Sequence, residues 1–99
     1  MIKILTLRES YDLYLLLKDH MPSKVNEIES VNFVGTIVHS IRESEEPENY
    51  AKAIEVFTGE DFSTIAENYN PTEVLELFIT GLMENNIILI SEFFSKMGF

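Results

Sequence analysis

Two histidines, His20 and His39, are the side chains of this 99-residue chain best suited to bind a transition metal or to transfer protons near neutral pH. They fall on different predicted helices. Neither belongs to a His-x-x-x-His or Glu-x-x-His pattern, the kind of spacing that places two metal ligands on one face of a helix. We therefore expect no metal site, and we expect these histidines to be exposed or to lie at helix ends.

Other catalytic groups lack the arrangement that their chemistry requires. The chain has no cysteine, so a thiolate nucleophile, a thiolate zinc site and a disulfide are excluded. Its four glycines are scattered and form no phosphate-binding loop, and no Gly-x-Ser-x-Gly or EF-hand pattern occurs. The sequence Asp61-Phe62-Ser63 departs from the Asp-Ser-Leu site that carries the prosthetic group of an acyl carrier protein. We expect a protein that is not an enzyme and that has no cofactor.

The charge of the chain is strongly asymmetric. The formal net charge is −10, and residues 1–42 hold five acidic and five basic residues. Residues 43–92 hold twelve acidic residues and a single basic one, Lys52. Such a chain does not suit a phosphate backbone, so we expect no nucleic-acid partner. The acidic half is explained by a solvated surface that favours solubility, or alternatively by a patch that receives a basic partner.

Size and apolar patterning predict one all-α domain over residues 1–99, a compact bundle of about five to six short helices. No apolar stretch is long enough to span a membrane, and the first residues do not resemble a signal peptide, so we expect an intracellular protein with no membrane partner. Residues 2–6 fit either a short strand or a lead into the first helix. Thr6 and Glu9 match a capping box, which predicts a helix over about residues 7–20 that ends before Pro22.

Helix start and stop signals divide the rest of the chain. Ser23 predicts the start of a second helix, Pro47 a third that Gly59 ends, Asp61 a short fourth, and Asn70 with Pro71 a fifth. Asn85 and Asn86 interrupt the pattern before a last helix over about residues 87–97. The apolar spacing predicts these inward side chains: Ile28, Val31, Val34, Val38 and Ile41; Tyr50, Ala53, Ile54 and Phe57; Phe62, Ile65, Ala66 and Tyr69; Val74, Leu75, Phe78, Ile79 and Leu82.

The first and last predicted helices carry more apolar surface than one small bundle can easily cover. In the last helix one stripe contains Ile87, Ile90, Phe94 and Met97, while Leu89 and Phe93 lie off that stripe. In the first helix the leucines also occupy more than one face. A helix that is apolar nearly all round must be enclosed. It is either the central helix of the domain or partly covered by another copy or a partner, and we expect a homo-oligomer.

The C-terminal third resembles the tail assembly chaperones of long-tailed bacteriophages, particularly those that infect lactic acid bacteria. Three segments carry the resemblance: Glu73-Val74-Leu75-Glu76-Leu77-Phe78, Gly81-Leu82-Met83-Glu84-Asn85-Asn86 and Phe93-Phe94-Ser95-Lys96-Met97-Gly98-Phe99. Acidity, size and the all-helical pattern are similar too. The resemblance implies a non-enzymatic protein of the host cell cytoplasm that binds the tape measure protein, a very long apolar helical chain, until tail-tube subunits assemble around it. Many members of the family also have a longer, frameshifted form.

The physical interpretation agrees with that mechanism, because a holding chaperone must present apolar surface and stay soluble. We expect several copies, in a ring or spiral, to contact the tape measure protein through the following residues: Leu13, Leu16, Leu17, Phe93, Phe94, Met97 and Phe99. The alternative is an acidic decoy that inhibits a basic nucleic-acid-binding protein. High salt distinguishes the two, since charge-driven binding would collapse and apolar binding would persist.

Overall fold

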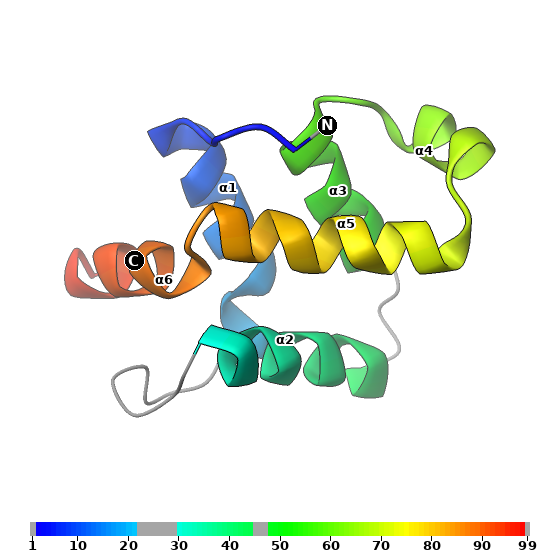
Figure 1. Ribbon diagram of the computed structural model, residues 1–99. Helices are drawn as coiled ribbons and strands as arrows, with labels where there is room; N and C mark the ends of the chain where they lie inside the picture. Colours follow the sequence, from blue (N-terminus) through cyan, green and yellow to red (C-terminus); the bar gives the residue numbers. More distant parts are fainter. Residues whose placement is uncertain (1, 22–29, 45–47, 99) are drawn as a thin grey trace.

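The computed structural model describes residues 2–21, 30–44 and 48–98, and it confirms the all-α prediction. Helix α1 is followed by a short 3₁₀ turn, η1, and then by five further α-helices that surround one core (Figure 1). Within the described residues there is no strand. The elements are α1 (Leu7–Leu17), η1 (Lys18–His20), α2 (Ser30–Ser44), α3 (Glu48–Thr58), α4 (Phe62–Asn68), α5 (Pro71–Glu84) and α6 (Ile87–Lys96).

The predicted helix starts are confirmed where an N-cap is described, whereas the first helix ends at Leu17 and reaches residue 20 only as the 3₁₀ turn η1. Thr6 and Asn70 each form a capping box with the Glu three positions later, and Asp61 accepts a hydrogen bond from the Thr64 amide at 2.9 Å. Gly59 ends α3 at a φ of 76°, a left-handed conformation that glycine adopts without strain. The predicted helix starts at Ser23 and Pro47, and the inward position of Ile28, lie outside the described residues.

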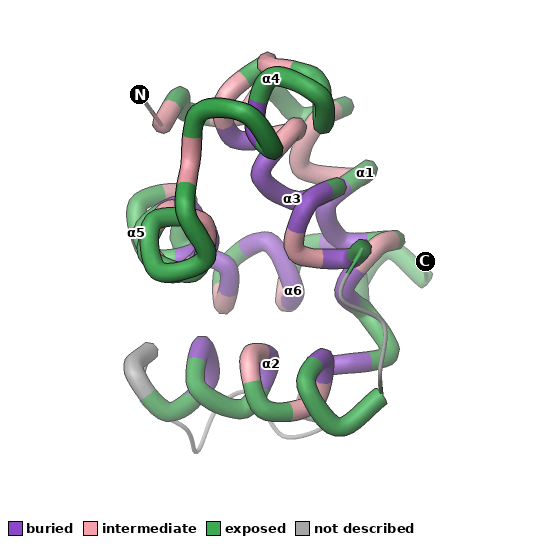
Figure 2. The backbone as a smooth tube through the Cα atoms, turned by 90° about the vertical axis from the view of Figure 1, so that its right-hand side faces the viewer, coloured by how far each residue is buried: buried purple, intermediate pink, exposed green. Residues whose placement is uncertain are grey.

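Helix α3 is central to the packing, because it contacts α1, α4 and α5. Figure 2 shows the buried sides of α2, α3 and α5 turned toward one another around the core. At the crossing of α3 and α5, Gly81 lies against the ring of Phe57, which is fully buried. On the other side, the ring of Phe94 from α6 packs against Tyr11 and Tyr14 of α1, with centroid distances of 5.3 and 5.4 Å. These contacts fix α5 and α6 against the first half of the chain.

Several inward predictions are confirmed and others need correction. Helices α3 and α5 bury Ala53, Ile54, Phe57, Phe78 and Leu82 as predicted. Helix α6 buries Ile87, Ile90 and Phe94. By contrast, Phe62, Ala66 and Leu75 are exposed, because α3, α4 and α5 leave an open groove between them at these positions. In α2, Val34 and Ile41 are buried as predicted, but Phe33 and Ile37 are buried too, and the pattern search missed both.

Residues 2–6 lie beside two helix ends and form no strand, so the second of the two interpretations, a lead into α1, describes this segment. The Lys3 amide donates to the Phe57 carbonyl oxygen at 2.9 Å, and the Leu5 amide donates to Oδ1 of Asn85 at 2.8 Å. The side-chain nitrogen of Asn85 donates to the carbonyl oxygens of Lys3 and Gly81, both at 3.1 Å. The segment therefore pairs with a side chain and a helix terminus instead of with a neighbouring strand.

Replacing Asn85 with alanine should lower the free energy of unfolding by about 1–3 kcal/mol, because the Leu5 amide loses its acceptor. The Leu5 amide should also exchange with solvent faster in native-state hydrogen exchange. The matched control is Asn68→Ala, since the Asn68 side chain makes an exposed local bond to Thr64. That change should cost no more than about 0.5 kcal/mol. Equal losses in the two variants would contradict the role assigned to Asn85.

Two exposed carboxylates at helix N-termini have lowered pKa values. A hydrogen bond from the Lys3 ammonium group, reinforced by the Thr6 amide, lowers the pKa of Glu9 below its ordinary value of 4.5. The Thr64 amide lowers the pKa of Asp61 below its ordinary value of 3.8. Because both folded-state values lie below the unfolded ones, these groups stabilise the fold above the unfolded pKa. That stabilisation is lost as the pH falls through the folded pKa.

The urea midpoint of Glu9→Gln should therefore lie below that of the wild type at neutral pH, and the gap should narrow toward about pH 3. The same comparison applies to Asp61→Asn. Comparing each variant with the wild type at the same pH removes the contribution of the other titrating groups, which both proteins share. A gap that stays constant, or that widens in acid, would contradict the assigned pKa shifts.

Candidate functional site

The residues predicted to contact a partner have very different exposures. Leu13 and Leu17 are fully buried between helices, and Phe94 is 4% exposed against the two tyrosines of α1. These three side chains belong to the core and are not accessible, so the predicted contact surface must be corrected. Leu16 is half-buried and packs against the core. Phe99 lies outside the described residues.

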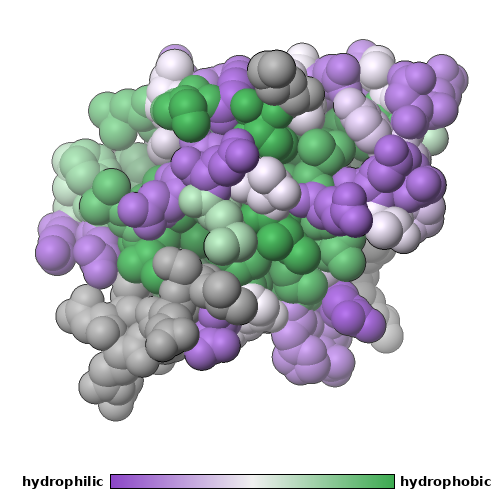
Figure 3. Space-filling model, in the orientation of Figure 1, coloured by the Kyte–Doolittle hydropathy of each residue, from purple (hydrophilic) through white to green (hydrophobic). Residues whose placement is uncertain are grey.

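The last helix is not wholly enclosed. Leu89, Phe93 and Met97 follow one another at four-residue spacing, with exposed fractions of 59%, 45% and 58%. This spacing places them in one row along α6 and its C-terminal cap, beside the buried side chains. We call these three residues the α6 stripe. Glu92 and Lys96 lie along one edge of it, four positions apart. Figure 3, which faces α5 and α6, shows hydrophobic surface interrupted by hydrophilic side chains.

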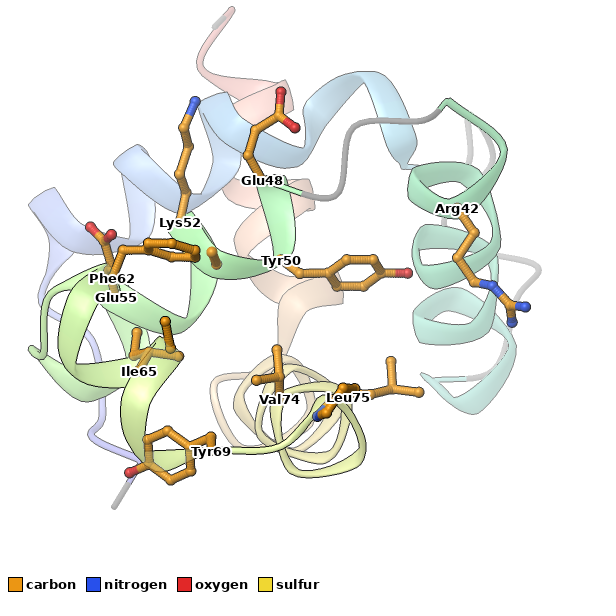
Figure 4. Close-up of a pocket in the computed structure, with 13 residues that line it drawn as sticks. Arg42, Glu48, Tyr50, Lys52, Glu55, Phe62, Ile65, Tyr69, Val74 and Leu75 are labelled. Carbon is orange, nitrogen blue, oxygen red and sulfur yellow. The ribbon is translucent and has the colours of Figure 1, made fainter.

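A second apolar surface is hollowed between α3, α4 and α5. This groove has a volume of about 1000 Å³, and α2 contributes Arg42 to its edge (Figure 4). Phe62 of α4 is 54% exposed within it, and Leu75 of α5 is 36% exposed. The apolar and aromatic lining consists of Tyr50, Ala51, Phe62, Ile65, Ala66, Tyr69, Pro71, Val74 and Leu75. A lining of this kind suits an apolar ligand or an apolar helix.

The two tyrosines of the groove are neutral at physiological pH. Burial raises the pKa of Tyr50, whose hydroxyl donates to the Val38 carbonyl oxygen at 2.9 Å and whose ring meets Phe78 edge-on at 4.9 Å. The nearby carboxylate of Glu60 raises the pKa of Tyr69 and accepts a hydrogen bond from it at 3.4 Å. With their hydroxyls bonded in this way, the tyrosines add aromatic surface to the groove without adding charge.

Charged side chains border the groove on α3. Glu48, Lys52 and Glu55 follow at positions i, i+4 and i+7 and therefore form one row along the helix. Figure 4 shows Lys52 and Glu48 at the upper edge and Arg42 on the side of α2. On α5, by contrast, the outer face is acidic, with Glu73, Glu76 and Glu84 exposed. The groove is thus an apolar channel bordered by both signs of charge.

The histidines occupy separate places. His39 is exposed on α2, 4.0 Å from Glu43. His20 ends the 3₁₀ turn, as one interpretation of the sequence predicted, but it is buried. Its Nδ1 lies 2.9 Å from the Ser40 hydroxyl and its Nε2 lies 3.3 Å from the Asn49 side-chain nitrogen. These bonds connect η1, α2 and α3. No group of three or more potential ligands able to hold a metal occurs among the described residues.

Sequence reasoning missed Phe62, Leu75 and Leu89 as accessible docking residues. Phe62 and Leu75 had been placed in the core because their spacing fits an inward face. The short length of the fourth helix was the available signal, because a short helix turns few side chains inward. Helix α4 buries Ile65 alone. Among the described residues no single helix has the length and apolar content to cross a membrane. Helices α5 and α6 together reach that length and apolar content, but the two helices are bent by 58° relative to each other.

Comparison of this chain with known protein families, with curated proteins and with solved structures finds no match. The case for a function therefore depends on the groove, the α6 stripe and the resemblance described above.

Proposed function

We propose that this protein is a non-enzymatic tail assembly chaperone of a long-tailed bacteriophage. It acts in the host cell cytoplasm, where it binds the tape measure protein and keeps that long apolar chain soluble until the tail tube forms. Several copies act on one client, because a long repetitive chain offers many similar sites. The sequence resemblance suggests this class, and the exposed surfaces suggest how the binding works.

The observation that carries the proposal is the groove between α3, α4 and α5. It is open, lined by apolar and aromatic side chains, and borders helices whose outer faces are acidic. An amphipathic helix binds such a groove by placing its apolar face inside. Phe62 and Leu75 contribute the most accessible apolar area, while the acidic outer face of α5 keeps the complex in solution. These two properties together are what a chaperone for an apolar client needs.

Co-expression tests the proposal. The client is a tape measure protein of a long-tailed phage, produced with and without this chain in the same host. We expect the client to be insoluble alone and soluble in a complex with this protein, and we expect the complex to survive size-exclusion chromatography. A client that stays insoluble in the presence of correctly folded protein would overturn the proposal.

A further inference from the structure

The groove and the α6 stripe are complementary surfaces of one chain. The groove is concave and apolar, whereas the stripe is a convex row of three apolar side chains on a helix. We propose that the α6 stripe of one copy docks into the groove of a second copy. This inference goes beyond the proposed function and does not rest on it, because the contact involves this chain alone. The client is proposed to bind the same groove, so a client helix and the α6 stripe of a second copy compete for it.

The position of the two surfaces determines the kind of assembly. Figure 1 shows α6 at one end of the molecule, while α4 and the start of α5, which line the groove, lie at the other. A copy therefore cannot fill its own groove with its own stripe. The contact is heterologous, because each copy offers a stripe to one neighbour and a groove to another. Such contacts extend head to tail unless the chain of copies closes into a ring.

The dimensions of the two surfaces agree. Leu89 to Met97 spans about 12 Å at the helical rise per residue, and the groove edge from Glu48 to Glu55 spans about 10 Å. The groove is open, so it can receive a helix side-on. Leu89 and Phe93 of the incoming helix would then cover Phe62 and Leu75, which a single copy leaves partly exposed.

The charges beside the two surfaces also match. Glu92 and Lys96 border the stripe four residues apart, about 6 Å along the helix. On α3, Lys52 is followed three residues later by Glu55 and preceded four residues earlier by Glu48. Placing Glu92 opposite Lys52 puts Lys96 opposite Glu55 if the helices are parallel, or opposite Glu48 if they are antiparallel. Either direction pairs opposite charges, so the Glu92–Lys52 pair is common to both arrangements.

The mass of the protein in solution tests the contact. Light scattering coupled to size-exclusion chromatography should show that the wild type self-associates as its concentration rises. Phe93→Glu removes the centre of the stripe and Leu75→Glu blocks the groove. Each should weaken self-association by about tenfold or more, because one buried apolar side chain is lost and a charge is placed in the contact. Ile4→Glu is the matched control, since Ile4 is 74% exposed and belongs to neither surface.

Mixing the two variants gives the decisive result. Phe93→Glu retains an intact groove and Leu75→Glu retains an intact stripe, so an equimolar mixture should form a 1:1 dimer that cannot grow. Circular dichroism verifies that each variant keeps its helix content. If either loses it, Met97→Ser and Phe62→Ser replace them at positions that are more exposed. A wild type that stays monomeric throughout, or a mixture that forms no dimer, would overturn the proposal. A Leu75→Glu variant that assembles like the wild type would instead indicate pairing of two stripes and would also overturn it.

Exchanging the charges of Glu92 and Lys52 tests this pair, which forms whether the two helices are parallel or antiparallel. Lys52→Glu alone and Glu92→Lys alone should each weaken self-association by about tenfold, because like charges then face each other. The double variant should return to within about threefold of the wild type. Failure of the double variant to recover would contradict the Glu92–Lys52 pairing. The client plays no part in these measurements, so a negative co-expression result would leave them unaffected.

Discussion

Replacing Gly81 with alanine should destabilise the protein by about 2 kcal/mol or more, although alanine is the better helix former. A β-carbon at this position of α5 would lie 2.6 Å from Cγ of Phe57 and closer still to two other ring carbons. The Phe57 ring is fully buried, so it cannot rotate into open space. The helices must therefore move apart, and packing is lost where α3 meets α5. Urea denaturation followed by circular dichroism measures the change in unfolding free energy.

Gly35→Ala is the matched control for that prediction. Gly35 is exposed in the middle of α2, and a β-carbon there would meet nothing within 4 Å. The same substitution should raise the free energy of unfolding by about 0.5–1 kcal/mol, through helix propensity and a less flexible unfolded chain. If both substitutions changed the free energy of unfolding in the same direction, α5 would not approach α3 closely at Gly81, which would contradict the prediction.

The second large effect concerns client binding. The double variant Phe62→Glu/Leu75→Glu should abolish the ability of the protein to keep the tape measure protein soluble, while its own fold remains intact. Each substitution removes an exposed apolar side chain from the groove and places a charge where an apolar helix would lie. Losing one such buried contact costs about 1.5–3 kcal/mol, so losing two weakens binding by at least a hundredfold. The soluble fraction of the co-expressed client is the readout.

The control for the groove variant has the same change in charge at a different place. Ile4 and Leu7 are 74% and 66% exposed and lie outside the groove, so Ile4→Glu/Leu7→Glu should leave client solubility unchanged. If this control and the groove variant lose activity equally, general acidity and not the groove would account for the loss. If neither loses activity, the client binds elsewhere on the molecule.

Local signals in the sequence were sufficient for the helix boundaries. The capping boxes at Thr6 and Asn70, the Asp61 cap and the left-handed Gly59 are each determined by neighbours within a few residues. These helix starts and the end of α3 therefore followed from the sequence alone, whereas the change to a 3₁₀ turn at Lys18–His20 did not. The sequence left residues 2–6 open between a strand and a lead into the first helix, because the partner that decides it, Asn85, lies eighty residues away from Leu5.

The exposed surfaces were harder to predict, since spacing identifies a face of a helix but not what covers it. Leu75 and Phe78 fall on one predicted face of α5, yet Phe78 is buried and Leu75 borders the groove. Similarly, Leu13 and Phe94 were expected at a partner surface and are core residues, packed where α1 meets α6. The excess of apolar surface on the last helix was anticipated correctly, but the tertiary packing decided which of its residues remain exposed.

The binding of the tape measure protein, measured at low and at high ionic strength, tests the central claim most directly. In the proposed function, apolar contacts in the groove bind the client, and the acidic surface confers solubility. Binding should therefore persist at high salt, since screening weakens charge pairs and leaves apolar contacts in place. A complex that forms at low salt and dissociates completely at high salt would contradict it and would favour an acidic protein that occupies a basic partner through charge alone.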